Sequence, residues 1–220
     1  MIKRFKKIIA IVMFIVSISS IPVYAVEDSK QKVILIDAGH GGIDGGAKSK
    51  NGTIEKGINL SISNKLKVKL EEKGYKVYMT RDEDKEISTK KVQDLEARCK
   101  MKKETKCDVF ISIHQNKFTQ ESCYGAQVWY ASNEKSQMIA TTIQESLKEK
   151  VDDNNKRVAK PAKNLYKILR DGYDGACVIV ECGFLSNYKE EQKLKTDEHQ
   201  DKIVDGILGG VEKYFQDKKE

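Results

Sequence analysis

The chain has 220 residues, of which 33% are charged and 7% are aromatic, and its formal net charge is +7. This length suits one domain with a substantial core, and with only two prolines the chain has no proline-rich linker. Without the four cations of residues 1–25 the net charge is +3, spread over many residues of both signs. Dispersed lysines of this kind are typical of solvated helix faces, so the composition predicts no nucleic-acid partner.

Residues 1–25 have the organisation of an export signal. Four cations precede the apolar run 8–21, and Val23-Tyr24-Ala25 offers a cleavage site that ends in a small residue. The run is shorter than the roughly 20 residues that span a bilayer, which favours cleavage over retention as an N-terminal anchor and leaves both open. Residues 26–32 form a short lead-in. We therefore expect a protein that is exported across the cytoplasmic membrane.

Two-residue and 3.6-residue periods of apolar side chains alternate after this lead-in without a long linker. This pattern predicts one continuous α/β domain over residues 33–217. The expected strands are 33–37, 75–80, 109–113, 125–130, 166–169 and 177–181. The expected helices are 55–73 with Gly74 as its stop, one from the cap Ser88 to about 105, one from the cap Asn133 to about 150, 189–194 and 198–215.

The five cysteines form an odd set without CxxC spacing, which argues against a disulfide framework and leaves a single disulfide open. Cys107 precedes one strand-like run, and Cys177 and Cys182 flank another. These positions favour small buried hydrophobic residues over metal ligands or nucleophiles.

The segment 33–47, VILIDAGHGGIDGGA, is the most informative part of the chain. A buried strand ends at Asp37, and the glycines that follow allow positive φ angles. They bring polar side chains over the carboxyl end of the strand, where open α/β sheets bind ligands, and we expect His40 there. Asp37 either accepts a hydrogen bond from a ligand histidine or simply ends the strand, and Asp44 has no assigned role.

Other interpretations of this segment fit less well. Residues 42–49 come close to the phosphate loop GxxxxGK[ST], but Ala47 replaces the last glycine and Asp44 would face the phosphate. Nucleotide binding is therefore disfavoured. A serine or cysteine hydrolase is disfavoured too, because the chain has no GxSxG motif and no cysteine for which a histidine partner can be argued.

Polar side chains that can bind a metal follow three separate strands. His40 and His114 come directly after two of them, Glu181 ends a third, and Glu55 opens the helix after the glycine loop. Because parallel strands have their carboxyl ends on one edge, these residues can share a pocket. Hydrolysis with zinc needs about three ligands and a nearby base, so the pattern predicts a metal or acid-base site. The third histidine, His199, is expected on an exposed helix start.

Five motifs in order give the chain a resemblance to a known family. It resembles the zinc-dependent N-acetylmuramoyl-L-alanine amidases of the amidase 3 type, which cut peptide stems from the glycan strands of peptidoglycan. The resemblance covers nearly all of residues 33–215. Its motifs are the glycine segment 33–47, Glu55-x-x-x-Asn59-Leu60, MTRDED at 79–84, FISIHQN at 110–116 and VIVECGFLSN at 178–187.

The resemblance implies a role for each residue of the predicted site. His40, Glu55 and His114 fall on the zinc-ligand positions of the family, with Zn2+ as the cofactor, and Glu181 falls on its catalytic glutamate. We expect a single α/β domain of the phosphorylase/hydrolase-like class, with a mostly parallel twisted central sheet of about six strands flanked by helices. Lys117 stands where the family often has a small residue, a departure expected to affect the substrate groove.

An export signal before a bare catalytic domain, together with RVAK at 157–160, resembles the spore-cortex, germination-specific subgroup. The expected reaction is hydrolysis of the amide between the lactyl group of N-acetylmuramic acid and L-alanine of the stem peptide. It would serve muramic lactam formation in the spore cortex or another part of the cell wall. We expect a monomer that binds peptidoglycan, and the need for an accessory exported protein stays open.

Two alternative functions stay open. One is a zinc peptidase acting on another amide, which would require a clamp for a substrate carboxylate, with Arg81 and Arg170 as the available arginines. The other is a non-catalytic wall-binding protein that kept the fold. The full set of candidate ligands together with Glu181 argues against this second alternative.

Overall fold

The computed structural model describes residues 31–218. The expected export signal, residues 1–25, and the lead-in up to residue 30 lie outside the described residues. Within the described part, none of the helices combines the length and the apolar character that a membrane crossing requires.

Six strands form one sheet with the order β2-β1-β3-β6-β4-β5. β1, β2, β3 and β6 run parallel to one another, whereas β4 is antiparallel to β6 and carries β5 on its outer edge. The mostly parallel α/β sheet expected from the sequence is therefore confirmed. The strands are Val33–Ala38 (β1), Lys76–Met79 (β2), Val109–Asn116 (β3), Gln127–Tyr130 (β4), Lys160–Pro161 (β5) and Ala176–Phe184 (β6).

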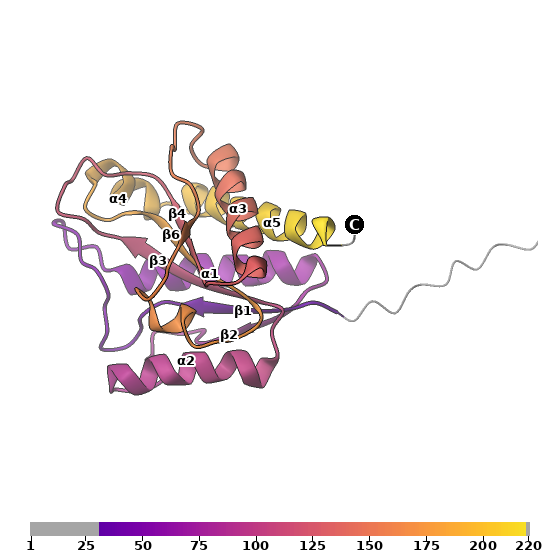
Figure 1. Cartoon of the computed structure of the whole chain (residues 1–220). Helices are drawn as coiled ribbons and strands as arrows, with labels where there is room; N and C mark the ends of the chain where they lie inside the picture. The colour runs from indigo at the N-terminus through magenta and orange to yellow at the C-terminus, as the bar shows by residue number, and fades with distance from the viewer. Residues whose placement is uncertain (1–30, 219–220) are drawn as a thin grey trace, which may run out of the picture. The chain divides into compact units, whose positions relative to one another are not determined.

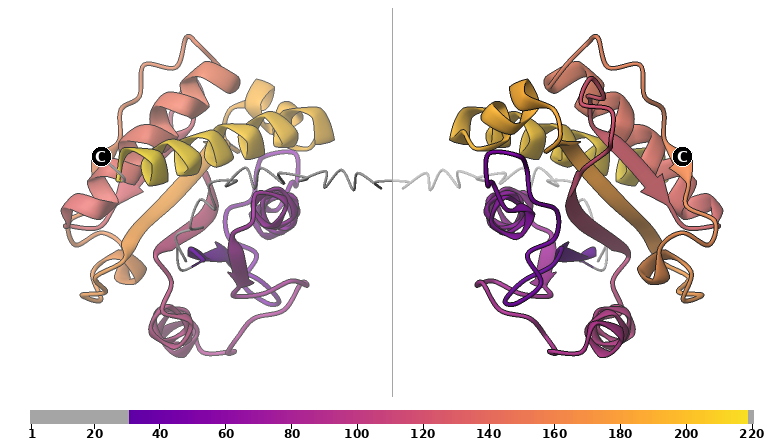
Figure 2. Two further views of the ribbon diagram at one scale, coloured as in Figure 1. Left: turned by 90° about the vertical axis from the view of Figure 1, so that its right-hand side faces the viewer. Right: turned by 90° about the vertical axis from the view of Figure 1, so that its left-hand side faces the viewer.

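Helices cover both faces of this sheet (Figure 1). The elements are α1 (Glu55–Glu72), α2 (Lys91–Thr105), α3 (Glu134–Lys150), the short 3-10 helix η1 (Lys167–Leu169), α4 (Tyr188–Leu194) and α5 (Asp197–Asp217). α5 packs against both α1 and α3, whereas α2 packs against β1 and η1. Figure 2 shows α1 and α2 end-on, on opposite sides of β1.

The alternation of side chains along the strands divides the interior into two cores. Ile34 and Ile36 of β1 lie in the larger core with the buried faces of α1, α3 and α5, and Leu35 lies in the smaller core near α2 and η1. Because both faces of the central strands are buried, these strands are apolar almost without interruption. The five cysteines are free, and three of them are buried: Cys107, Cys177 and Cys182.

Two of the predicted helix boundaries are confirmed and one is wrong. α1 ends at Glu72, and Gly74 has a φ of 83°. The side chain of Asn133 caps α3 by accepting a hydrogen bond from the backbone N–H of Ser136. Ser88 does not cap α2, which begins only at Lys91. The reason is Asp94, whose carboxylate accepts hydrogen bonds from the backbone N–H groups of residues 87 and 88 and holds them outside the helix.

The strand predicted at 166–169 is also wrong, because residues 167–169 form η1. Ile168 and Leu169 are both buried in the smaller core. Consecutive residues of a strand point to opposite faces of a sheet, so a strand could not place both side chains in one core, whereas a helical turn can. The sixth strand is instead the two-residue β5.

A buried ion pair supports the carboxyl end of β1. Asp37 is 1% exposed, and its carboxylate accepts hydrogen bonds from Arg98 Nη1 at 2.6 Å, Ser112 Oγ at 2.6 Å and Thr80 Oγ1 at 2.8 Å. Although burial opposes ionisation, Arg98 and Ser112 lower the pKa of Asp37 to about 2. Arg98 also donates to the backbone oxygens of Ala38 and His40, so this pair connects α2 to the segment that carries the candidate site.

Replacing Arg98 by methionine should destabilise the fold strongly, because Asp37 would remain buried without its cation. The loss of one partner of a buried ion pair typically costs about 3–5 kcal/mol in the free energy of unfolding. Urea unfolding of the two proteins measures the difference. Lys100→Met on the same helix is the control, since Lys100 is 75% exposed in its ion pair with Glu104. A loss below about 1 kcal/mol, the level of a surface pair, would contradict this account.

Candidate metal and catalytic site

The glycine loop after β1 packs its backbone directly against functional side chains. A Cβ atom on Gly39 would lie 2.3 Å from Nε2 of His114, and one on Gly46 would lie 2.6 Å from the carboxylate of Glu55. His40 itself has a φ of 62°, an uncommon conformation for a residue with a side chain. The glycines are therefore required for close packing around the site, and the backbone strain is concentrated at His40.

Three of the predicted site residues come together at this edge of the sheet. Nε2 of His40 lies 3.3 Å from Oε2 of Glu55, and Nδ1 of His114 lies 2.9 Å from Oε1 of Glu55. The two imidazole rings are nearly perpendicular, with centroids 4.9 Å apart. One possible ligand atom from each residue lies within 4.8 Å of the other two. This spacing allows all three side chains to contact one metal ion.

Backbone and amide groups hold the Glu55 carboxylate in place. Oε1 accepts hydrogen bonds from the backbone N–H of Gln115 at 3.0 Å and from Asn59 Nδ2 at 3.1 Å, and Oε2 accepts one from the N–H of Ala47 at 2.7 Å. Although burial opposes its ionisation, hydrogen bonds from His114 and His40 hold the pKa of Glu55 well below its usual range. Glu55 is therefore an anion with a fixed orientation.

The charges of the three residues fit a cation. Burial opposes a charge on the His114 ring, yet its contact with Glu55 raises the pKa of His114 to about 9. Glu55 also raises the pKa of His40 against the effect of burial, so the buried carboxylate favours protons on both imidazoles in the metal-free protein. A divalent cation would replace them, because metals bind neutral imidazole and ionised carboxylate. Two imidazole nitrogens and one carboxylate are also a ligand set typical of catalytic transition-metal sites.

Asp44 is a site residue that the sequence reasoning missed. Its Oδ2 lies 2.9 Å from Nδ1 of His40, and its Oδ1 accepts a hydrogen bond from the backbone N–H of Gly46. An acceptor at Nδ1 keeps the proton on that nitrogen, so Nε2, which faces Glu55, is free to bind a metal. The signal in the sequence was the spacing His40-x-x-x-Asp44, which has meaning only once the loop conformation is known.

Asp37 and Arg81 have structural roles. Asp37 has no hydrogen bond with a histidine ring among those found in residues 31–218, so its alternative role as a partner of a ligand histidine is not supported. Arg81 is 2% exposed and donates to the backbone oxygens of five residues, namely Ala38, Gly39, His40, Lys56 and Glu83. Its guanidinium is therefore used in holding the loop and is not placed to clamp a substrate carboxylate.

Glu181 lies beside the three residues on the neighbouring strand, where it is in register with His114. It is 8% exposed, and its Oε2 has no hydrogen-bond partner within residues 31–218. Burial, with a smaller contribution from Glu55, raises the pKa of Glu181 to about 7, although His114 opposes this shift. A carboxyl group that titrates near neutral pH can both accept and donate a proton, as general acid-base catalysis requires.

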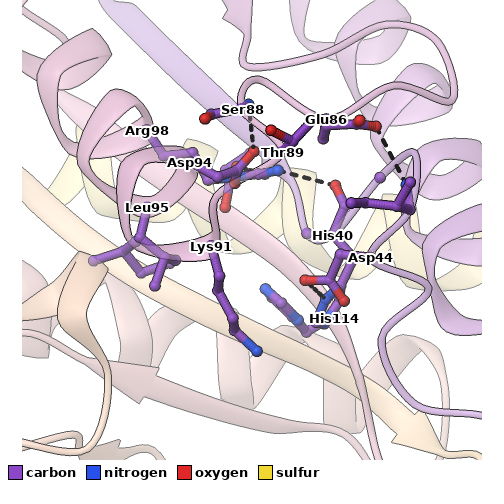
Figure 3. A pocket seen from close by; sticks show the side chains of 15 residues that line it. His40, Asp44, Glu86, Ser88, Thr89, Lys91, Asp94, Leu95, Arg98 and His114 are labelled. Carbon is purple, nitrogen blue, oxygen red and sulfur yellow. Dashed lines mark hydrogen bonds and ion pairs between the residues drawn. The ribbon is translucent and has the colours of Figure 1, made fainter.

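A cavity of about 300 Å3 opens beside the two histidines (Figure 3). His40, Asp44 and His114 line one side of it. The other side is formed by α2, the segment before it and η1, through Ser88, Thr89, Lys91, Leu95 and Ile168. The cavity gives a substrate access to the two histidines, whereas neither Glu55 nor Glu181 is among the residues that line it.

His199 lies away from this cavity, in the first turn of α5. It was expected on an exposed helix start, but it is only partly exposed, and burial lowers its pKa to about 4. Its position gives it no part in the candidate site.

Comparison with known proteins identifies relatives over nearly the whole described domain. The sequence profile of a family described as N-acetylmuramoyl-L-alanine amidase matches residues 34–213. A germination-specific N-acetylmuramoyl-L-alanine amidase from Bacillus subtilis is 34% identical, over 85% of this chain and 81% of the relative.

Solved structures show the same likeness. The CwlD amidase of Clostridioides difficile, solved in complex with the GerS lipoprotein, has a TM-score of 0.80 and 38% identity, over 84% of this chain and 99% of that one. An N-acetylmuramoyl-L-alanine amidase from Clostridium difficile 630 has a TM-score of 0.77 and 32% identity, over 86% of this chain and 98% of that one.

Replacing Asp44 by asparagine should lower the affinity for a divalent metal about 10-fold or more, because residues that orient a ligand histidine typically contribute 10–100-fold. Calorimetric titration with Zn2+ measures the affinity, and circular dichroism verifies that the fold is retained. Asp82→Asn is the matched control, since Asp82 is 77% exposed in a nearby loop. Equal affinities for both variants would contradict the role given to Asp44.

Proposed function

This chain belongs to the N-acetylmuramoyl-L-alanine amidase family, and we propose that it uses Zn2+ to hydrolyse the amide between the lactyl group of N-acetylmuramic acid and L-alanine of peptidoglycan stem peptides. The observation that carries the proposal is the cluster of His40, Glu55 and His114 beside the buried, unpartnered carboxyl group of Glu181. The first three would be the zinc ligands, and Glu181 would be the catalytic acid-base group.

The ligand set supports zinc as the metal. Catalytic zinc sites use three protein ligands, commonly histidine with a carboxylate, and keep one position open for water or substrate. His40, Glu55 and His114 supply three such ligands, and the adjoining cavity gives access to an open position. When bound, zinc supplies a Lewis acid that polarises the amide carbonyl and lowers the pKa of water.

Glu181 provides the proton transfers. Burial raises the pKa of Glu181 to about 7 in the metal-free protein, and a carboxyl group of this kind can accept the proton of the attacking water. The protonated carboxyl group then donates to the nitrogen of the departing L-alanine, so the C–N bond breaks and an amine leaves. One residue thus serves first as a base and then as an acid.

The residues around the ligands hold them in position. Asn59 and Gln115 fix the Glu55 carboxylate, and Asp44 orients His40. The amide of Asn59 also donates to the backbone oxygen of Gly39, which ties α1 to the glycine loop. Because these contacts exist before a substrate binds, little reorganisation is needed when charge develops in the reaction.

A role in the spore cortex is the second part of the proposal. It is supported by the similarity to the germination-specific amidase of Bacillus subtilis and to the CwlD amidase. Removal of stem peptides there would prepare muramic acid for lactam formation. The export signal predicted at residues 1–25 would bring the chain to its substrate. Because the CwlD amidase was solved with the GerS lipoprotein, we include an accessory exported lipoprotein as a partner.

The two alternative functions have less support. A zinc peptidase needs a cation for a substrate carboxyl terminus, but Arg81 is committed to backbone oxygens, and Arg170 does not line the cavity. A non-catalytic wall-binding protein would not require a buried carboxyl group without a partner, which is costly in the fold. The unpartnered Glu181 therefore favours an enzyme.

Mass spectrometry of purified peptidoglycan after incubation with the exported part of the chain tests the activity. We expect peptides with a free L-alanine amine when zinc is present, and none after chelation. Peptides released at another amide would support the peptidase instead. Absence of both bound zinc and released peptides would support the wall-binding alternative.

Replacing Glu181 by glutamine should leave zinc bound and reduce turnover at least ~100-fold, the lower range for general acid-base catalysis. Metal content by mass spectrometry and peptide release give the two readouts. Glu145→Gln on the exposed side of α3 is the control. Near-normal turnover of the Glu181 variant would refute its assignment.

A further inference from the structure

The lining of the cavity beside the candidate metal site includes an exposed cation that has no partner in the described part of the chain. Lys91, the first residue of α2, lines the cavity together with His40 and His114. Its ammonium group has neither a hydrogen bond nor an ion pair within residues 31–218. The arginine of the lining, Arg98, is engaged with Asp37 and Asp94, and the two histidines are the candidate metal ligands. Lys91 is therefore the cavity cation that is available to a ligand.

None of the acidic residues of the lining forms an ion pair with Lys91 within residues 31–218, although the charge of Lys91 adds to the effect of His40 in lowering the pKa of Asp44. Asp37 and Asp94 pair with Arg98, and Asp44 is bound to His40. Glu86 accepts a hydrogen bond from the backbone N–H of residue 43. In Figure 3 the side chain of Lys91 points away from Glu86. An anionic group that enters the cavity at this end would meet Lys91.

The proposed substrate carries free anionic groups on only one side of the scissile amide. This step rests on the proposed function. The lactyl carboxyl group of muramic acid is consumed in the scissile amide, and N-acetylated sugars are neutral. Free carboxylates of the substrate are therefore on the stem peptide. A lysine is a flexible point charge that can pair with a carboxylate presented from several angles.

We propose that Lys91 is a specificity-determining residue that binds the stem-peptide carboxylate nearest to the scissile amide, on the residue that follows L-alanine. The stem then runs over the start of α2, between Leu95 and Ile168 on one side and the histidines on the other. The glycan strand leaves the metal site in the opposite direction. Lys91 thus sets the direction in which the substrate lies across the site.

A binding experiment on the zinc-loaded exported chain tests this assignment without relying on turnover. Two synthetic stem peptides begin with L-alanine and differ only at the second residue, which carries either a free carboxylate or a primary amide. NMR titration should show that the wild type binds the carboxylate peptide about fivefold to tenfold more tightly, as a partly solvated charge-assisted contact allows. Lys91→Met should remove this preference, and Lys91→Arg should keep it.

Lys90→Met is the matched control, because Lys90 is an exposed neighbour that does not line the cavity. It should retain the full preference for the carboxylate. Equal binding of both peptides by the wild type would overturn the proposal. So would an equal loss of affinity for both peptides in the Lys91→Met variant, because a merely structural role affects them alike.

Turnover of glycan-linked substrates with the same single difference separates this proposal from the proposed function. In the Lys91→Met variant, KM for the carboxylate substrate should rise about fivefold to tenfold, with kcat unchanged within about twofold. The amidated substrate should show no change in either constant. A wild type that prefers the carboxylate peptide but never cleaves the muramoyl amide would uphold the binding site and refute the amidase.

Discussion

The parallel pairing of β1, β3 and β6 is the constraint on which the whole site depends. It brings the ends of three strands that are far apart in the sequence to one edge, with His114 and Glu181 in register on adjacent strands. The buried pair of Arg98 and Asp37 supports this edge from the side of α2. Arg81 binds the same turn through backbone oxygens. The loop that carries His40 is thereby held by two buried guanidinium groups, so its strained backbone conformation persists.

The two buried glutamates, Glu55 and Glu181, differ in their electrostatic surroundings. Glu55 accepts hydrogen bonds from backbone, amide and imidazole groups, and it remains ionised. Glu181 is buried almost as deeply, but its Oε2 has no hydrogen-bond partner in the part of the chain that the structure describes, so its charged form is destabilised. Two carboxylates of the same chemistry therefore suit different tasks, one as a metal ligand and the other as a group that exchanges protons. The surroundings of each carboxylate set its pKa and thereby the task that it suits, as is general for paired carboxylates in active sites.

The α/β class and the placement of His40, Glu55, His114 and Glu181 at one edge of the sheet could be predicted from the sequence for a physical reason. Buried parallel strands are recognisable as apolar runs, and His40, His114 and Glu181 stand where such runs end. The start of α2 and the conformation of residues 167–169 depend on tertiary contacts, which the sequence does not show. Asp94 holds residues 87 and 88 outside α2, and the smaller core turns residues 167–169 into a 3-10 helix.

The partners of the main residues also depend on the three-dimensional structure. Asp44 reaches His40 only because His40 has a positive φ angle, and Lys91 becomes notable only once the acidic groups around it are seen to have other partners. Extended X-ray absorption at the zinc edge, combined with an anomalous difference map, tests the central claim most directly. We expect one zinc ion bound by His40 Nε2, His114 Nδ1 and a Glu55 oxygen at about 2.0–2.2 Å. A metal bound elsewhere, or coordination that excludes any of these three residues, would contradict it.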